Sequence, residues 1–218
     1  MSSLIAATAV FIATHFLPST PLRAALARAI GEGPYRGLYS LVALAGIVWM
    51  SVAYSRAPVE PLWTPLRELP LFVLPFAFVL LACGYWRNPT MVGADKLLKS
   101  EDPARGVIRI TRHPLMWAIM LWALTHVLAR GDLKSLVFFG GLFVLAALGT
   151  VLIDHRKTAN PDWARFAAAT SNIPFLAIMQ GRNRIVWREI GWLRPFAGLA
   201  AFVAFLTVHS SLFGARPY

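Results

Sequence analysis

The chain has 218 residues, of which 57% are hydrophobic and 14% are charged, and its mean hydropathy is +0.59. A soluble domain carries about 25% charged residues, so most of this chain's surface cannot face water. Motifs of soluble enzymes, among them a Walker loop, G-x-S-x-G and H-E-x-x-H, are absent. The composition therefore excludes a soluble enzyme or binding domain and predicts an integral membrane protein.

The apolar residues fall into blocks that are bounded by turn residues or charges, and the blocks are too long for ordinary core helices. We expect an all-α, polytopic transmembrane helical bundle of about six helices, forming a single domain over residues 1–218. The spans are predicted near residues 2–17, 36–54, 68–86, 113–130, 133–153 and 190–209. The first span is short for a hydrocarbon layer about 30 Å thick, so it must tilt little or continue past Pro18 as a kinked helix.

The basic residues are distributed unevenly between the two sides of the predicted bundle. With the N-terminus outside, loops 18–36, 87–112 and 154–189 face the cytoplasm and hold 15 of the 21 basic residues: Arg23, Arg28, Arg36, Arg87, Lys96, Lys99, Arg105, Arg109, Arg112, Arg156, Lys157, Arg165, Arg182, Arg184 and Arg188. This bias follows the positive-inside rule, and it assigns the net charge of +11 to contacts with membrane lipid rather than with nucleic acid. We expect a multi-pass protein of the bacterial inner membrane with both termini on the periplasmic side.

Two loops are long enough to carry structure of their own. Residues 19–30 have a proline in the first turn and amphipathic spacing, and they predict a short interfacial helix that ends at Gly31. Residues 160–174 predict a turn of helix on the cytoplasmic face. Asp154 adjoins the inner end of the fifth span, where we expect it to be solvated, and Asn88 is expected to turn the chain after the third span.

Three histidines, His15, His126 and His209, lie at membrane depth. A polar side chain there is costly unless it has a partner or a task. One interpretation is a hydrogen bond between helices. The other is metal or haem ligation, because a neutral imidazole nitrogen binds iron strongly. The spacing leaves both open.

The run from Arg109 to Pro114, RITRHP, precedes the fourth span. It can be a basic helix start at the lipid headgroups, since proline suits the first turn of a helix. It can also be a cationic rim for an acidic group such as a haem propionate or a cofactor carboxylate. His113 and His126 are about 20 Å apart along a helix, so they cannot both ligate one iron.

The sequence resembles the NnrU-like membrane proteins, which include the plant and cyanobacterial 15-cis-zeta-carotene isomerases. The resemblance runs through most of the chain. It is carried by His15 with Leu22-Arg23, by Gly31-Glu32 with Tyr35-Arg36 and Tyr39, by Gly106–Pro114 (GVIRITRHP), by Trp122 with His126, and by Ile173-Pro174-Phe175, Ala177-Ile178 and Gly181-Arg182.

The resemblance implies a haem b inside the membrane, with His15 and His126 as the axial ligands of its iron. Their depths conflict, because His15 lies near the inner face while His126 lies about 20 Å beyond His113, which is therefore the fallback ligand. Arg109 and Arg112 lie at the depth expected for haem propionates, with Arg36 as a helper.

The isomerase branch carries a cysteine three residues before the second ligand, where this chain has Ala123. Ligand switching by cysteine is therefore in doubt, and so is isomerase activity; the bacterial branch is associated with nitric oxide and nitrite metabolism, or denitrification. A haem-dependent cis-trans isomerase would take an apolar polyene, a carotenoid for example, from the lipid. The predicted lining is Met116, Trp117, Met120 and Trp122. A haem carrier or sensor fits the same residues.

An alternative comes from a different class. The stretch RHPLMW (residues 112–117) resembles the RHPxY stretch of isoprenylcysteine-type membrane methyltransferases. In those enzymes a cationic helix start helps to bind S-adenosylmethionine. Their second motif, a glutamate pair followed by a tyrosine-rich stretch before a proline, is echoed only by Asp154, Trp163 and Phe166 before Pro174.

Overall fold

A computed structural model describes residues 1–214 of the protein and shows a helical backbone. Within this range the one β-bridge joins Pro61 to Asp132. Six longer helices are α1 (Ser2–Phe16), α3 (Glu32–Arg56), α4 (Leu69–Gly84), α5 (Pro114–Arg130), α6 (Leu133–Lys157) and α10 (Leu193–Phe213). Helices α3, α6, α10 and the first helix with its following turn are long and apolar enough to cross a membrane; α4 and α5 are shorter apolar helices. The predicted class of fold is confirmed.

The connecting segments form short helices. These are η1 (Leu17–Ser19), α2 (Pro21–Ile30), η2 (Asp95–Lys99), η3 (Gly106–Arg109), α7 (Trp163–Ala169), α8 (Leu176–Met179) and α9 (Trp187–Ile190). The helix expected over residues 19–30 is confirmed as α2, and the turn expected over 160–174 is confirmed as α7. The first span passes into the 3-10 turn η1 at Leu17, continues past Pro18 to Ser19 and ends at Thr20, where the backbone is extended.

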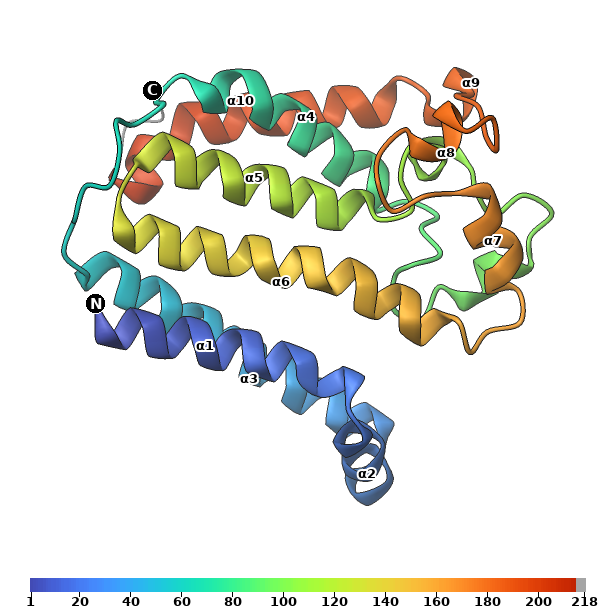
Figure 1. Cartoon of the computed structure of the whole chain (residues 1–218), viewed down its shortest axis with the longest axis horizontal. Coiled ribbons are helices and arrows are strands. Elements are labelled where there is room, and N and C mark those ends of the chain that lie inside the picture. Colours follow the sequence, from blue (N-terminus) through green and yellow to red (C-terminus); the bar gives the residue numbers. More distant parts are fainter. Residues whose placement is uncertain (215–218) are drawn as a thin grey trace.

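The six long helices lie side by side in the order α10, α4, α5, α6 and then α1 with α3 (Figure 1). Their directions alternate along the chain, so Met1 and the end of α10 lie at the same end of the bundle. The opposite end, which we call the cap, carries α2, α7, α8 and α9. The three loops predicted to share one side thus meet at the cap, whereas its assignment to the cytoplasmic face stays a prediction.

Local sequence explains the hairpin between α5 and α6. Pro114 occupies the first turn of α5, where no backbone N–H is needed. Gly131 ends that helix with φ +65°, a left-handed conformation that a side chain would strain. Asp132 then caps α6 by accepting a 2.8 Å hydrogen bond from the backbone N–H of Ser135. The two helices therefore pack antiparallel over their whole length.

Glycines let neighbouring helices approach closely. At four of them an added Cβ would come within 3.0 Å of the next helix: Gly46 at Phe11, Gly84 at Pro114, Gly141 at Thr8 and Gly198 at Phe78. Lipid tails are as apolar as the side chains, so close van der Waals packing at small residues contributes much of helix association in a membrane. These contacts fix the register of α4 against α5, of α6 against α1 and of α10 against α4.

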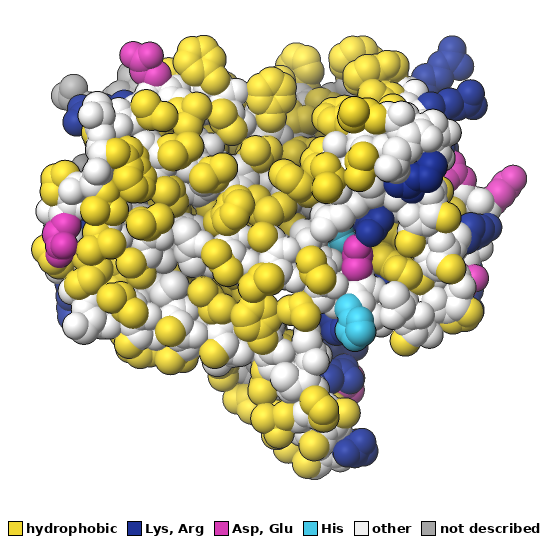
Figure 2. Space-filling view, viewed as in Figure 1, with side chains coloured by type: hydrophobic (Ala, Val, Ile, Leu, Met, Phe, Trp, Pro, Cys, Tyr) yellow, Lys and Arg dark blue, Asp and Glu magenta, His cyan; other side chains and the backbone are white. Residues whose placement is uncertain are grey.

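Most apolar side chains face outward. The main buried cluster lies where α1, α3, α5 and α6 meet and comprises Leu4, Ala7, Phe11, Met50, Ala53, Ala57, Ala123, Val127, Phe138 and Phe139. Elsewhere large apolar residues cover the sides of the bundle (Figure 2), such as Phe72 on α4 and Phe196 on α10. Such a surface suits lipid rather than water. The protein is a multi-pass membrane protein.

Replacing Gly198 with alanine should separate α10 from α4. Its Cβ would lie 2.7 Å from the carbonyl oxygen of Phe78, and a backbone atom cannot yield without moving the helix. Overpacking costs about 1–3 kcal/mol, so we expect a lower melting temperature in detergent. Gly140→Ala is the control, because its Cβ would make ordinary contact at 3.6 Å with Leu136 of the same helix. Equal melting temperatures for the two variants would contradict this packing.

Candidate functional site

The tautomer of His126 is set by a hydrogen bond to the backbone. It lies on α5, and its Nδ1–H donates a 2.7 Å hydrogen bond to the carbonyl oxygen of Trp122. A carbonyl only accepts, so the neutral ring keeps its lone pair on Nε2, the tautomer that a metal needs. The ring stacks on Phe139 at 4.8 Å and lies 5.0 Å from Trp122. An aromatic wall thus surrounds a half-buried imidazole.

His15 has the same tautomer at the end of α1. Its Nδ1–H donates to the carbonyl oxygen of Phe11 over 2.7 Å, and Nε2 again keeps the lone pair. Its ring contacts Phe11 at 4.2 Å and Tyr39 at 5.9 Å. The aromatic neighbours of His15 belong to α1 and α3, whereas those of His126 belong to α5 and α6.

The structure does not bring His15 and His126 to one depth. Helices α1 and α6 run in the same direction and meet where Thr8 faces Gly141. His126 stacks on Phe139, two residues before that meeting point, and His15 lies seven residues beyond Thr8. At 1.5 Å per residue the two imidazoles are about 13 Å apart along the bundle. Two ligands of one iron would have to lie at nearly the same depth, which this register does not give, and the pairing of the two histidines on one iron stays a prediction.

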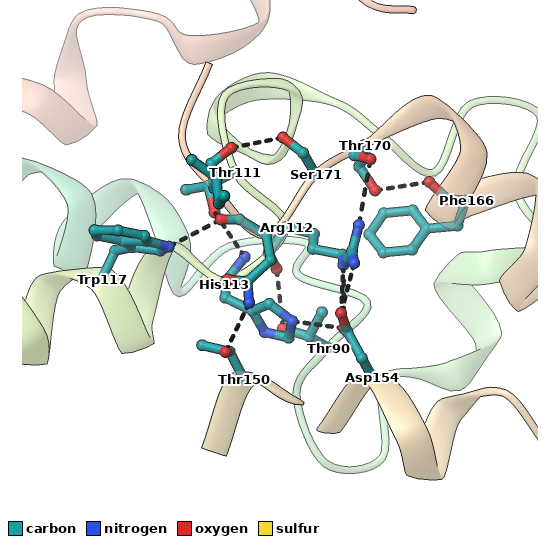
Figure 3. Close-up of polar contacts among 12 residues, drawn as sticks. Thr90, Thr111, Arg112, His113, Trp117, Thr150, Asp154, Phe166, Thr170 and Ser171 are labelled. Carbon is teal, nitrogen blue, oxygen red and sulfur yellow. Dashed lines mark hydrogen bonds and ion pairs between the residues drawn. The ribbon is translucent and has the colours of Figure 1, made fainter. Parts of the chain in front are cut away.

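His113 and Arg112 meet Asp154 where α5 begins and α6 ends (Figure 3). His113 Nε2 lies 2.6 Å from Asp154 Oδ1, and Arg112 donates to both carboxylate oxygens from Nε at 3.1 and 2.9 Å and to Oδ2 from Nη2 at 2.5 Å. The side chain of His113 is wholly buried. The expectation that Asp154 is solvated was wrong: its side chain is 21% exposed and holds two partners.

The same cluster ties the segment after α7 to the start of α5. Thr111 donates from Oγ1 and Trp117 donates from Nε1 to the carbonyl oxygen of Asn172, over 2.7 and 2.9 Å. The backbone N–H of Arg112 donates to the carbonyl of Ser171 (Figure 3). RITRHP is thus a structural junction in this fold, with Arg112 at its surface.

Arg109 lies in a second ionic cluster. It donates to Glu189 from Nε and Nη2 over 2.8 and 2.9 Å, to Asn183 over 2.9 Å, and to Asp102. The backbone N–H of Gly106 also donates to Glu189. Hydrogen bonds from Arg109 hold the pKa of the Glu189 carboxyl below its usual range. Arg109 thereby joins η3 to α9.

Each arginine predicted for the cationic rim has a carboxylate of its own chain. Arg109 pairs with Glu189, Arg112 pairs with Asp154, and Arg36 pairs with Glu32 over 3.0 Å. To hold a haem propionate, each of these arginines would have to exchange its carboxylate partner for the propionate. The fallback ligand His113 already uses one ring nitrogen on Asp154, and its other nitrogen is buried.

Sequence reasoning missed Glu189 and Asn172. One signal for Glu189 was available, because it is the one acidic residue after Asp162 and must face a surplus of arginines. Asn172 offers no such signal, since its role depends on the fold bringing loop 170–172 against α5. The turn expected at Asn88 is confirmed, because its side-chain oxygen accepts the backbone N–H of Thr90 over 2.9 Å.

The fold and these clusters define a multi-pass helical membrane protein with ligand-competent histidines in the bundle and ionic junctions at the cap. The profile of the family described as "NnrU protein" matches residues 3–217. The chain belongs to the NnrU protein family.

Two relatives carry the name "15-cis-zeta-carotene isomerase, chloroplastic". The Zea mays protein is 28% identical over 173 residues, which are 75% of this chain and 47% of the relative. The Arabidopsis thaliana protein is 37% identical over 164 residues, which are 71% of this chain and 44% of the relative. The chain thus spans less than half the length of either relative. No solved structure matches this chain.

Glu189→Gln should remove part of the pH dependence of stability. Because the pKa of Glu189 is lowered in the folded state, its ion pair stabilises the fold at neutral pH and is lost as the pH falls through the lowered pKa, below about 4.3. We expect the melting temperature to fall more steeply between about pH 5 and 3 in the natural protein than in the variant. Glu101→Gln, an exposed acid before Asp102, should keep the natural profile. Parallel profiles for the natural protein and Glu189→Gln would argue against this linkage.

Proposed function

We propose that this protein binds haem b inside the helical bundle, where His126 would hold the iron, and that it isomerises a cis double bond of an apolar polyene. The observation that carries the proposal is the fixed tautomer of His126, which leaves the lone pair on Nε2 of a ring that contacts Trp122 of α5 and Phe139 of α6. Family membership and the names of the two relatives support the reaction.

The donor set fits a haem held by His126 and does not fit a shared iron for His15 and His126 in one chain. Each imidazole alone is suitable, but their depths differ by about 13 Å. Ala123, one turn before His126, is fully buried and has no atom that can bind iron. We infer that ligation is by His126 and that no protein thiol exchanges with it.

When bound, haem would supply an iron that coordinates, or exchanges an electron with, the polyene and so weakens its double bond. The chain's own residues hold the ligand and exclude water. Trp122 orients His126 through its carbonyl group, and Phe139 stacks on the ring, so the imidazole presents a fixed face. The site needs no proton donor, because isomerisation has no net proton transfer.

The side chains predicted to line the site differ in burial. Met120 is buried, whereas Met116, Trp117 and Trp122 are half-buried. Trp117 donates its N–H to Asn172 at the cap, and the sulfur of Met116 lies 3.6 Å from the Cβ position of Gly149 on α6. Trp122 contacts the buried ring of Phe139 and lies beside His126, so it is the aromatic side chain that a wholly apolar substrate would reach from the lipid.

Ligand variants test the cofactor. The protein purified in detergent from haem-sufficient cells should show a Soret band. His126→Ala should lose the haem and with it the Soret band, whereas His15→Ala should keep the natural spectrum because His15 lies at another depth. His155→Ala, an exposed histidine at the cap, is the matched control.

Two results would contradict this assignment. An equal loss in His15→Ala would show that both histidines share an iron, which needs a different helix register or a second chain. A colourless protein that binds S-adenosylmethionine would support the methyltransferase alternative.

Activity is tested with 15-cis-zeta-carotene as substrate. The dithionite-reduced protein should convert it to the trans isomer, and the oxidised protein should not, because a ferrous iron releases an electron more readily. His126→Ala should lose conversion. Conversion by the oxidised protein alone would refute this mechanism, and no conversion in either state would leave a haem carrier or sensor.

A further inference from the structure

Two open pockets adjoin each other at the cap and share Arg182. The larger, of about 630 Å³, lies between α7 and α8 and has Arg112 and Arg182 beside Ile173 and Leu176. The smaller, of about 320 Å³, is formed by Arg109 and the turn from Gly181 to Arg184. Four arginines therefore line one continuous region, with apolar side chains on one flank.

The charges of these arginines are not equally compensated. Arg109 and Arg112 are paired with carboxylates. Arg182 donates only to uncharged acceptors, the side-chain oxygen of Gln180 and the carbonyl groups of Ala168 and Thr170. Within residues 1–214, Arg182 and Arg184 have no ion pair. Two positive charges consequently face the pockets without a counterion from the chain.

The surroundings place this region at the edge of a membrane. The segment from 158 to 192 joins two spanning helices, α6 and α10. Trp187 and Trp192 in it are 71% and 84% exposed, and Met179 is 81% exposed. Exposed tryptophan beside arginine is typical of the headgroup layer. Figure 2 shows Lys and Arg side chains gathered at this end, above and beside the apolar sides of the bundle.

We propose that the two pockets form a binding site for an anionic phospholipid. Arg182 and Arg184 hold the phosphate, and an acyl chain lies along Ile173 and Leu176. The uncompensated charge selects an anion, and the apolar flank selects a lipid over free phosphate. The site is independent of the proposed haem chemistry, since it lies at the cap and uses none of the bundle histidines.

The experiment measures the melting temperature of the delipidated, full-length protein in neutral detergent against added phosphatidylglycerol or phosphatidylcholine with the same acyl chains. Phosphatidylglycerol should raise the melting temperature until it reaches a plateau. The phosphatidylglycerol concentration that gives half of the full shift should increase about fivefold in Arg184→Gln. It should increase about fivefold further in the double variant Arg182→Gln/Arg184→Gln. The control is Arg165→Gln: Arg165 also donates to two backbone carbonyls, those of Leu98 and Ser100, but lines neither pocket.

Arg184 makes no side-chain hydrogen bond within the described residues, so its variant tests binding without disturbing the fold. An unchanged response to phosphatidylglycerol in Arg184→Gln and in the double variant would overturn the proposal. So would an equal effect of phosphatidylcholine, which would indicate apolar binding only. A full response to glycerol 3-phosphate or inorganic phosphate would assign the site to a soluble anion instead.

Discussion

The carboxylate of Asp154 joins three parts of the chain that are far apart in sequence. It accepts hydrogen bonds from Arg112 at the start of α5, it lies at the end of α6, and through Arg112 it reaches the carbonyl of Thr170 after α7. In lipid there is little hydrophobic drive to hold helices together, so a polar junction at their ends has a large role in fixing register. Removing one partner of this half-buried pair would leave the charge of the other uncompensated.

The register that this junction sets decides which histidines can act together. Counting from Pro114, His126 lies about 18 Å along α5, well toward the end of the bundle that holds Met1. His15 lies at the other end of its own span, and the contact of Thr8 with Gly141 prevents α1 from sliding to compensate. Residue type alone makes both histidines equally good ligands. The two histidines differ in their depth along the bundle.

The cap separates arginines of two kinds. Arg109, Arg112 and Arg36 are bound to carboxylates of the chain and contribute mainly to its fold. Arg182 and Arg184 have no carboxylate partner within residues 1–214, and their charge is available for an external anion. A count of basic residues treats all of them alike, because it cannot show where Glu189 or Asp154 will lie. The positive bias of the cap is therefore partly internal structure and partly, as we propose, a surface for anionic lipid.

The sequence by itself determined the helical class, the approximate spans, the interfacial helix before Gly31 and the family, because these depend on local composition, turn residues and motifs. It also selected His126 and the RITRHP run as the chemically notable features. Tertiary structure alone decided that Asp154 pairs with Arg112 and His113 and that Glu189 pairs with Arg109, whereas the different depths of His15 and His126 were already expected from their positions in the sequence. The physical reason is that such pairings depend on how far one helix is shifted along another, and that shift is set by contacts between residues such as Gly141 and Thr8 that no local pattern encodes.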